Sequence, residues 1–309
     1  MMDESRLSRR EFLIRGATLG LTCAGFSLLS SPSVLKAMSE PAASGPLDLA
    51  IAKGGDPSGN TIKAIETLGG IGRFVKKGNK VVVKPNPCTP NRPEIASTTN
   101  PAVVETVVAM CLEAGAREVV VLSHDSLSNF ERNGIMEAAS RTGARVVAAV
   151  TRDLYESVPV LRGRVLQEVE IARDVLDADV FINMPIAKHH SETGLTLSMK
   201  NLMGINWDRG YFHQHGLQQA IADLSTAVKP ALIVMDANRI LLTNGPSGPG
   251  ETRDEKAVIA GTDPVAVDAY TATLFGRNPE DIGHIRYAYE LGVGEMNVEK
   301  LRIKEESVH

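Results

Sequence analysis

Short aliphatic runs alternate with helix-like segments through the first half of the chain, and this alternation constrains the fold more than any other feature. The runs "LDLAIAK", "KVVVKPNP" and "REVVVLSHDS" have the length and composition of buried strands. Between the second and third lies "TNPAVVETVVAMCLEAGA", where Asn100 suits a helix N-cap, Pro101 the first helical position and Gly115 the stop. This order predicts an α/β fold, with a mostly parallel sheet and helices on both faces. The 309 residues, 43% of them hydrophobic, suffice for one large unit or for two α/β lobes.

The second half continues the pattern with the apolar runs "DADVFINMP", "PALIVMDA" and "KAVIAGTDP" and with helical segments near 217–228, 264–276 and 282–291. Asp263, before Pro264, suits a helix N-cap. Ligands of such sheets usually bind in the loops that follow the carboxyl ends of parallel strands. These loops carry "KPNPC", "SHDS", "PIAKHH", "DANR" and "GTDP". We therefore expect their polar side chains to converge at one edge of the sheet.

The N-terminal stretch has the organisation of an export signal. Arg9 and Arg10, within "SRREFL", precede the apolar run "GATLGLTCAGFSLL", which is followed by small and polar residues. The arginine pair with Phe12 and Leu13 resembles the twin-arginine signal. This predicts a signal peptide over residues 1–37, a linker over 38–47 and an α/β domain over 48–305. The alternative is a charged surface helix or a membrane anchor, but the apolar run is short for a bilayer span.

The resemblance to this signal implies a periplasmic or otherwise exported protein. The twin-arginine translocase would be a partner during export, and no stable membrane span would remain after processing. Passengers of this route fold beforehand, and many acquire a metal or organic cofactor first. Only Cys88 and Cys111 follow the signal, without a CxxC motif, so an iron–sulfur cluster has no framework in the sequence. A net charge of −4, a pI near 6.0 and 4% aromatic residues argue against nucleic acid as a partner.

Lysines and amides follow two of the predicted strands. In "KPNPC", two prolines stiffen the loop that carries Asn86, and Lys84 ends the apolar strand before it. Lys188 in "AKHHSETG", together with Lys200 and Asn201, adds two cations and an amide near a second strand end. Such a set is typical of a site for a carboxylate or a phosphate. The alternative for Lys84 is a rigid surface turn with a solvated lysine head.

Histidines and one aspartate are the candidates for proton transfer or metal binding. Because neighbouring side chains point in different directions, we expect only one of His189 and His190 to face a given site. Asp125, beside a histidine in "SHDS", suits a metal ligand or an acid–base role, and a turn cap is the equal alternative. His213 and His215 in "WDRGYFHQHG" can meet one metal if the chain there is extended. The same segment could instead form a mobile loop over the site.

Taken together and in order, several motifs resemble the domain-of-unknown-function 362 family over most of residues 48 to 292. They are "VVVKPNP", "VFINMPIAKHH", "TGLTLSMKNLMG", "AIADLSTAVKPALIVMDA", "NGPSGPG" and "GTDPVAVDAYTATLFG". The resemblance aligns Lys188 and His190 with a Lys-x-His stretch of relatives, and Asp125 with their "GDS" stretch. It implies an unassigned activity. Many relatives carry a ferredoxin-like segment with cysteine clusters, which this chain lacks. The chain also bears a distant likeness to the lactate racemase (nickel-pincer) fold.

Two functional hypotheses follow from these residues. The first is an exported enzyme acting on a small anionic substrate with a bound metal or cofactor, with redox or isomerisation chemistry favoured. Its predicted catalytic residues are His190, Asp125 and Lys188; its substrate-binding residues are Lys84, Asn86, Lys200 and Asn201; its metal ligands are His190, Asp125, His213 and His215. The second is a non-catalytic periplasmic module that binds a ligand or assists cofactor assembly. A strongly perturbed histidine or lysine pKa would favour the enzyme.

Overall fold

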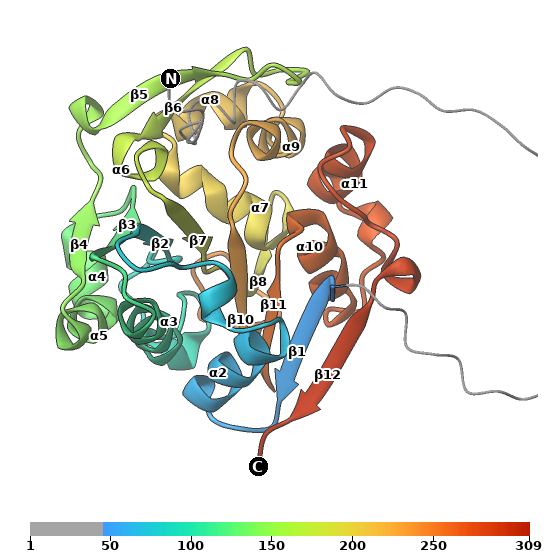
Figure 1. Ribbon diagram of the computed structural model, residues 1–309. Coiled ribbons are helices and arrows are strands. Elements are labelled where there is room, and N and C mark those ends of the chain that lie inside the picture. The colour runs from blue at the N-terminus through green and yellow to red at the C-terminus, as the bar shows by residue number, and fades with distance from the viewer. Residues whose placement is uncertain (1–45) are drawn as a thin grey trace, which may run out of the picture.

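A ten-stranded mixed sheet forms the centre of the protein in a computed structural model that describes residues 46–309 (Figure 1). The predicted signal peptide, and the linker except for its last two residues, lie outside these described residues. The strands are β1 (Leu49–Lys53), β2 (Lys80–Lys84), β3 (Glu118–Ser123), β4 (Arg145–Ala148), β5 (Tyr155–Pro159), β6 (Glu168–Ala172), β7 (Val180–Asn183), β8 (Ile186–His190), β9 (Gly194–Thr196), β10 (Leu232–Leu241), β11 (Thr252–Gly261) and β12 (Ile303–Ser307).

The helices of the described residues are mostly short. They are α2 (Pro57–Thr67), α3 (Pro101–Glu113), α4 (Leu127–Arg132), α5 (Ile135–Thr142), α6 (Arg173–Leu176), α7 (Ser198–Asn201), α8 (Arg209–Gln214), α9 (Leu217–Ala227), α10 (Pro264–Thr273) and α11 (Gly283–Glu290). A 3₁₀ turn, η4 (Leu202–Ile205), continues directly from α7. Within residues 46–309, no helix combines the length and the apolar character that a membrane crossing requires.

The sheet order is β12-β1-β11-β10-β7-β2-β3-β4, and β8 pairs with β10 and carries β9. Parallel pairs join β10 to β7, β7 to β2, β2 to β3 and β3 to β4, which confirms the predicted mostly parallel sheet. The sheet is continuous, so the described strands are not split into two separate lobes. β5 and β6 form a separate antiparallel hairpin.

Antiparallel β11 corrects one expectation about the ligand-binding edge. Gly261, the last residue of β11, pairs with Ile233 near the start of β10. The segment "GTDP" therefore lies beside the amino end of β10, away from Leu241 at its carboxyl end. "DANR" lies inside β10 and is not a loop. Sequence period fixes which residues share a face but not the direction of a strand, and this is why "GTDP" was placed at the wrong edge. "DANR" was expected in a loop but lies in the strand because β10 continues beyond the end of its neighbour β7.

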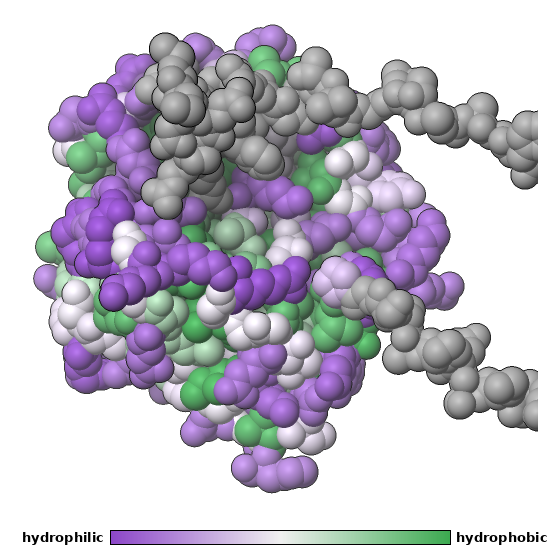
Figure 2. All heavy atoms as spheres, viewed as in Figure 1, coloured by the Kyte–Doolittle hydropathy of each residue, from purple (hydrophilic) through white to green (hydrophobic). Residues whose placement is uncertain are grey.

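Helices cover both faces of the sheet (Figure 1). Val81 and Val83 of β2 belong to a hydrophobic cluster that includes buried residues of α2, α3 and α5. Val82, between them, belongs to a second cluster that includes residues of α9, α10 and α11. Burial on both faces explains why the strands are unbroken aliphatic runs. On the face shown in Figure 2, hydrophilic residues cover most of the described surface, with hydrophobic residues in small patches between them.

Local capping fixes the helices close to the site. Asn100 and Asp263 cap α3 and α10 as predicted, each accepting from backbone N–H groups of the first turn. The motif "TGLTLSMKNLMG" is divided into β9, α7 and η4. Gly194, with φ +75, turns the chain into β9. α7 then begins only where the buried Asp268 carboxylate accepts the N–H groups of residues 198 and 199.

Candidate anion-binding site

A pocket of about 230 Å³ lies where β2 ends, beside β8, β9 and α7. It brings together eight side chains that the sequence singled out: Lys84, Asn86, Asp125, Lys188, His190, Lys200, Asn201 and His213. Six further residues complete its lining: Cys88, Thr196, Met203, Gly204, Arg209 and Pro246. His215 is the one predicted site residue that does not line it. The convergence expected at the strand ends is therefore present.

Lys84 is held by a network of amides. Its Nζ donates to Asn201 Oδ1 at 2.7 Å, and Asn86 Nδ2 donates to the same oxygen at 2.9 Å. Asn201 Nδ2 donates in turn to Asn183 Oδ1 at 2.8 Å. The backbone of Gly204 packs against the Lys84 side chain so closely that a Cβ added there would lie 2.6 Å from Nζ. The amides fix the ammonium without neutralising it.

Lys188 is fully buried and also lacks a carboxylate partner within the described chain. Its Nζ donates to Ser97 O at 2.5 Å and to Asn86 Oδ1 at 3.1 Å, and it lies 3.1 Å from Cys88 Sγ. A buried charge without a counter-ion is costly unless dipoles or a ligand compensate it. The three contacts supply dipoles, and the open side of the pocket leaves room for a ligand.

Two polar groups of the pocket have no hydrogen-bond partner of oxygen or nitrogen within residues 46–309. Lys200 Nζ contacts Met203 Sδ at 3.7 Å and makes no other polar contact there. The hydroxyl of Thr196, a residue 4% exposed, also lacks a partner. Unsatisfied buried donors are rare in native proteins, because each costs the free energy of its lost hydration. Thr196 Oγ1 is such a donor, and the half-buried Lys200, whose ammonium has only a thioether beside it, lines the same pocket.

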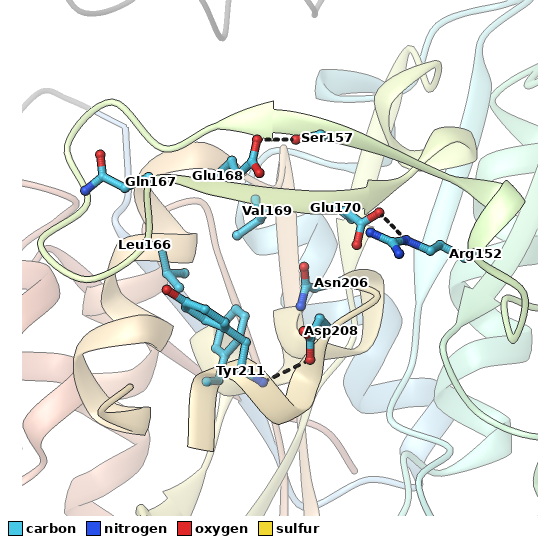
Figure 3. A pocket seen from close by; sticks show the side chains of 11 residues that line it. Arg152, Ser157, Leu166, Gln167, Glu168, Val169, Glu170, Asn206, Asp208 and Tyr211 are labelled. Atoms are coloured by element: carbon cyan, nitrogen blue, oxygen red, sulfur yellow. Dashed lines mark hydrogen bonds and ion pairs between the residues drawn. The ribbon is translucent and has the colours of Figure 1, made fainter. Parts of the chain in front are cut away.

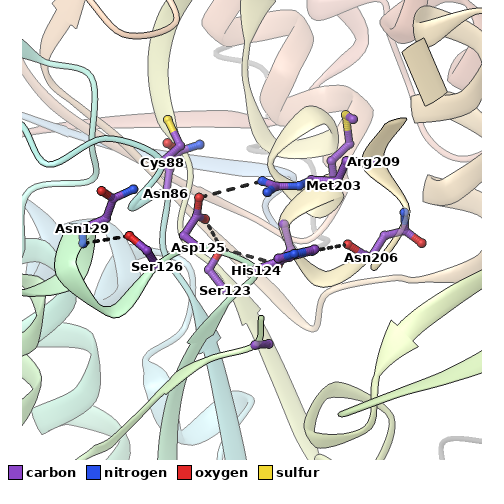
Figure 4. Close-up of polar contacts among 12 residues, drawn as sticks. Asn86, Cys88, Ser123, His124, Asp125, Ser126, Asn129, Met203, Asn206 and Arg209 are labelled. Atoms are coloured by element: carbon purple, nitrogen blue, oxygen red, sulfur yellow. Dashed lines mark hydrogen bonds and ion pairs between the residues drawn. The ribbon is translucent and has the colours of Figure 1, made fainter. Parts of the chain in front are cut away.

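The charges of the pocket are strongly unbalanced. Its lining contains three lysines and Arg209 but one carboxylate, that of Asp125. Arg209 Nη1 lies 3.8 Å from Asp125 Oδ1 (Figure 4), while no carboxylate of the described residues lies within 4.0 Å of any of the three lysine Nζ atoms. A concave surface with this excess of one sign concentrates ions of the other.

Burial perturbs the titration of three groups in the pocket. It lowers the pKa of Lys84 to about 7, against the attraction of Asp125. It lowers the pKa of Lys200 to about 8, with the positive charge of Lys188 as the next cause. It lowers the pKa of His190 to about 3, again with help from a lysine, Lys200. At neutral pH His190 is therefore uncharged, and Lys84 exchanges readily between its two protonation states.

His190 has a defined tautomer. Its Nδ1 accepts the backbone N–H of Glu192 at 3.1 Å and, more weakly, that of Thr193 at 3.4 Å. The proton of the neutral ring therefore resides on Nε2, which is a hydrogen-bond donor. His189 points elsewhere: its Nδ1 accepts from Gly245 N at 3.0 Å, and the pocket lining does not include it. The expectation that adjacent histidines diverge is confirmed.

The two histidines of "WDRGYFHQHG" are separated because the segment forms the helix α8, which contains His213 and has His215 as its C-cap, and not the extended strand that a shared metal would require. His213 Nδ1 lies 2.7 Å from Glu192 Oε2 at the pocket. His215 stacks on Tyr211, with ring centroids 3.7 Å apart. Among residues 46–309 no three His, Cys, Asp or Glu side chains are grouped so that they could hold a metal ion.

The residues of "SHDS" divide between the pocket and a helix cap (Figure 4). Asp125 reaches the pocket, where its Oδ2 accepts from Ser123 Oγ at 2.8 Å. Ser126 caps α4 through Asn129 N, which lies 3.3 Å from Oγ. His124 turns away, with Nδ1 at 3.1 Å from Asn206 O and its ring stacked on an indole.

Sequence reasoning missed Arg209 and Thr196 as site residues. Arg209 begins α8, a segment that was considered for its histidines alone. Thr196 belongs to β9, and this short strand places it opposite Lys188, with which it pairs. Neither residue stands in a motif that would have identified it. Their positions result from the packing of α8 and β9 against the strand ends.

Comparison with known proteins identifies the family of this chain. A model of the family described as "Domain of unknown function (DUF362)" matches residues 81–273, more than half of the chain. The thylakoid-associated protein sll1697 of Synechocystis sp. is 26% identical over 246 residues, which cover 74% of this chain and 73% of that protein. The lactate racemase apoprotein of Thermoanaerobacterium thermosaccharolyticum is similar in structure over 79% of this chain and 57% of its own, with 11% identity and a TM-score of 0.46. On the strength of the family match, this chain belongs to the DUF362 family.

Proposed function

We propose that this protein binds a small anionic molecule in the pocket between Lys84, Lys188 and Lys200, and that it acts on this molecule by proton transfer. The observation that carries the proposal is the pair of unsatisfied donors, Lys200 Nζ and Thr196 Oγ1, in a pocket whose lysines have no carboxylate partners in the described chain. An anionic oxygen would satisfy both donors and compensate the buried charge.

The size of the pocket limits the substrate. At about 230 Å³ it is smaller than the roughly 300–1,000 Å³ typical of sites for drug-sized ligands. A metabolite with one or two carboxylate groups, or a small phosphate ester, matches this volume and this charge. Lys188 and Arg209 would hold the anionic group, and the Nε2–H of His190 would donate to a neighbouring oxygen.

Proton transfer is the chemistry that these side chains can supply. Burial lowers the pKa of Lys84 to about 7. An amine with this pKa can accept and return a proton at neutral pH, which an ordinary lysine cannot. Asp125, on the same pocket, offers a second proton acceptor. We therefore favour isomerisation of the bound anion, and binding without turnover is the second outcome that the experiment distinguishes.

The test combines binding with isotope exchange. The folded protein is titrated calorimetrically with acetate, lactate, malate, phosphate and sulfate. Carboxylates that bind are then incubated with it in D₂O, and deuterium uptake at carbon is followed by NMR. Lys200→Met should weaken binding at least about tenfold, since a charge-assisted hydrogen bond is lost. The matched control is Lys300→Met, which removes an exposed lysine (61% exposed) outside the pocket.

Each outcome has a defined meaning. If binding depends on Lys200 and a bound carboxylate takes up deuterium at carbon, the result supports an enzyme that transfers protons. If anions bind but none of the carboxylates takes up deuterium, the result supports a ligand-binding module. If no anion binds, or if Lys200→Met and Lys300→Met behave alike, the proposal fails. Elemental analysis of protein purified without chelators tests the separate prediction of a metal on His190 and Asp125.

We further propose that the protein acts outside the cytoplasm. The support is the paired Arg9 and Arg10 ahead of a short apolar run. A fusion of residues 1–47 to a reporter should be exported in cells with the twin-arginine translocase and retained in cells without it. Replacement of both arginines by lysine should have the same effect as loss of the translocase. Export that persists in either case would overturn this part of the proposal.

A further inference from the structure

A second and larger cavity, of about 450 Å³, lies between the β5–β6 hairpin and α8 (Figure 3). None of its lining residues belongs to the anion pocket. The hairpin that forms its upper wall is firmly anchored. Asp223 Oδ2 on α9 accepts the backbone N–H groups of residues 164, 165 and 166, at 2.8, 2.7 and 3.0 Å. The cavity is therefore bounded by elements that are fixed to the core.

The buried part of the lining combines apolar side chains with one unsatisfied donor. Leu166, Val169 and Phe212 are buried and belong to the hydrophobic core. Asn206, 1% exposed, stands between the hairpin and α8 in Figure 3, and its Nδ2 has no hydrogen-bond partner within residues 46–309. A buried amide N–H without an acceptor is costly. An acceptor atom of a ligand in the cavity would remove that cost.

The rim carries three carboxylates, those of Glu168, Glu170 and Asp208. Glu168 Oε2 accepts from Ser157 Oγ at 2.9 Å, and Asp208 Oδ1 accepts from Tyr211 N at 2.9 Å. Within the described chain neither carboxylate has a cation within 4.0 Å, whereas Glu170 is paired with Arg152 at 2.8 Å. Each carboxylate can accept several hydrogen bonds, so both retain free acceptor capacity. The rim therefore offers acceptors to the donor groups of a ligand.

These requirements define the chemistry of the ligand. Its inner end must accept a hydrogen bond, its outer end must donate, and its middle must tolerate an apolar surface. A hydroxyl group both donates and accepts, whereas an ammonium group has no acceptor and a carboxylate has no donor. We propose that the cavity beneath the β5–β6 hairpin is a binding site for a small neutral polyhydroxylated molecule of monosaccharide size. The site is separate from the anion pocket and does not depend on its function.

The helix α8 forms a wall of both sites. Asp208 at its N-cap, with Tyr211 and Phe212, lines the cavity. Arg209 and His213 line the anion pocket. A ligand in the cavity contacts the helix that positions Arg209, and thermodynamic linkage makes any effect of one ligand on the affinity of the other reciprocal.

The experiment is a calorimetric titration of the folded protein with glucose, galactose and sorbitol, with 1,4-diaminobutane and acetate as probes that carry only donors or only acceptors. Asn206→Leu removes the buried donor, and Glu168→Gln weakens a rim acceptor. Glu299→Gln, an exposed carboxylate outside both sites, is the control. We expect binding of at least one polyol, weakened about tenfold by Asn206→Leu and about fivefold by Glu168→Gln, and unchanged by Glu299→Gln.

The proposal is overturned if no polyol binds, including the case in which the diamine or acetate binds instead and this binding is weakened by Asn206→Leu. It is also overturned if Asn206→Leu and Glu168→Gln both bind polyol like the wild type. Circular dichroism and thermal unfolding report whether Asn206→Leu is folded. If it is not, the comparison of Glu168→Gln with Glu299→Gln decides. Since sulfate and polyol use different residues, failure of the anion proposal leaves this test intact.

Discussion

Binding of an anion should be accompanied by proton uptake in slightly alkaline solution. Burial lowers the pKa of Lys84 to about 7 and that of Lys200 to about 8. At pH 8 the two lysines together therefore carry only roughly 0.6 of a positive charge, by ordinary titration. An anion nearby raises the pKa of each lysine by about 1–3 units, so that both become protonated. We expect an uptake of about one proton per anion at pH 8 and almost none at pH 6.

Calorimetry measures this uptake directly. Sulfate is the suitable probe, because its own charge does not change over this pH range. Titrations in Tris and in triethanolamine, whose ionisation enthalpies differ, give the number of protons from the dependence of the observed enthalpy on the buffer. With about one proton taken up, the affinity should fall about tenfold per pH unit near pH 8. Lys200→Arg, which stays charged, should reduce the uptake by roughly half a proton; Lys300→Arg should leave it unchanged.

The reasoning is refuted if sulfate binds at pH 8 with no proton exchange, or with proton release. Either result would mean that Lys84 and Lys200 are already charged in the free protein, and that burial does not perturb them. A loss of uptake in Lys300→Arg would show that the protons come from outside the pocket.

Three further results are expected. Lys84→Met should raise the free energy of unfolding, measured in urea, by about 3 kcal/mol at pH 6, because it removes a buried charge. This gain should shrink between pH 7 and 10.5. In that range the folded wild type has released the Lys84 proton while the unfolded chain still holds it, so the wild type no longer buries the charge. Gly204→Ala should weaken sulfate binding about tenfold by calorimetry, because its Cβ would lie 2.6 Å from the Lys84 ammonium; unaltered affinity would contradict this. Asp268→Asn should destabilise the protein by about 2 kcal/mol in thermal unfolding, since one amide oxygen replaces two carboxylate oxygens as acceptors for Ser198 and Met199 N–H. An unchanged melting temperature would show that these two hydrogen bonds to Asp268 do not stabilise the fold.

The central strands were predictable because they are buried on both faces. A strand such as β2 then reads as a continuous aliphatic run, and capping residues such as Asn100 mark the helices between the runs. β12 was not foreseen. Its sequence, "IKEES", is largely polar because it lies at the edge of the sheet and pairs on one side only. The sequence does not record strand direction either, which is why "GTDP" was assigned to the carboxyl edge of the parallel strands although β11 runs antiparallel to β10.

The candidate site was predictable where chemistry and strand ends coincide. Lys84 ends a core strand, and Lys188 lies in the strand that continues beyond another core strand, β7. Arg209 and Thr196 reach the pocket through tertiary packing, which no local pattern records. His215 was grouped with its neighbour on the assumption of an extended chain, whereas the helical turn of α8 directs it elsewhere.

The position of β1 has a consequence for the synthesis of the protein. β1 lies between β11 and β12 and pairs with no other strand of the described chain. The ribosome completes β1 at Lys53, but its first partner begins at Thr252 and its second ends at Ser307. Among the described strands, β1 must therefore wait, unpaired, until synthesis has reached β11. Its docking therefore closes the sheet only after the parallel core strands have been made, in a chain that we propose leaves the cytoplasm already folded.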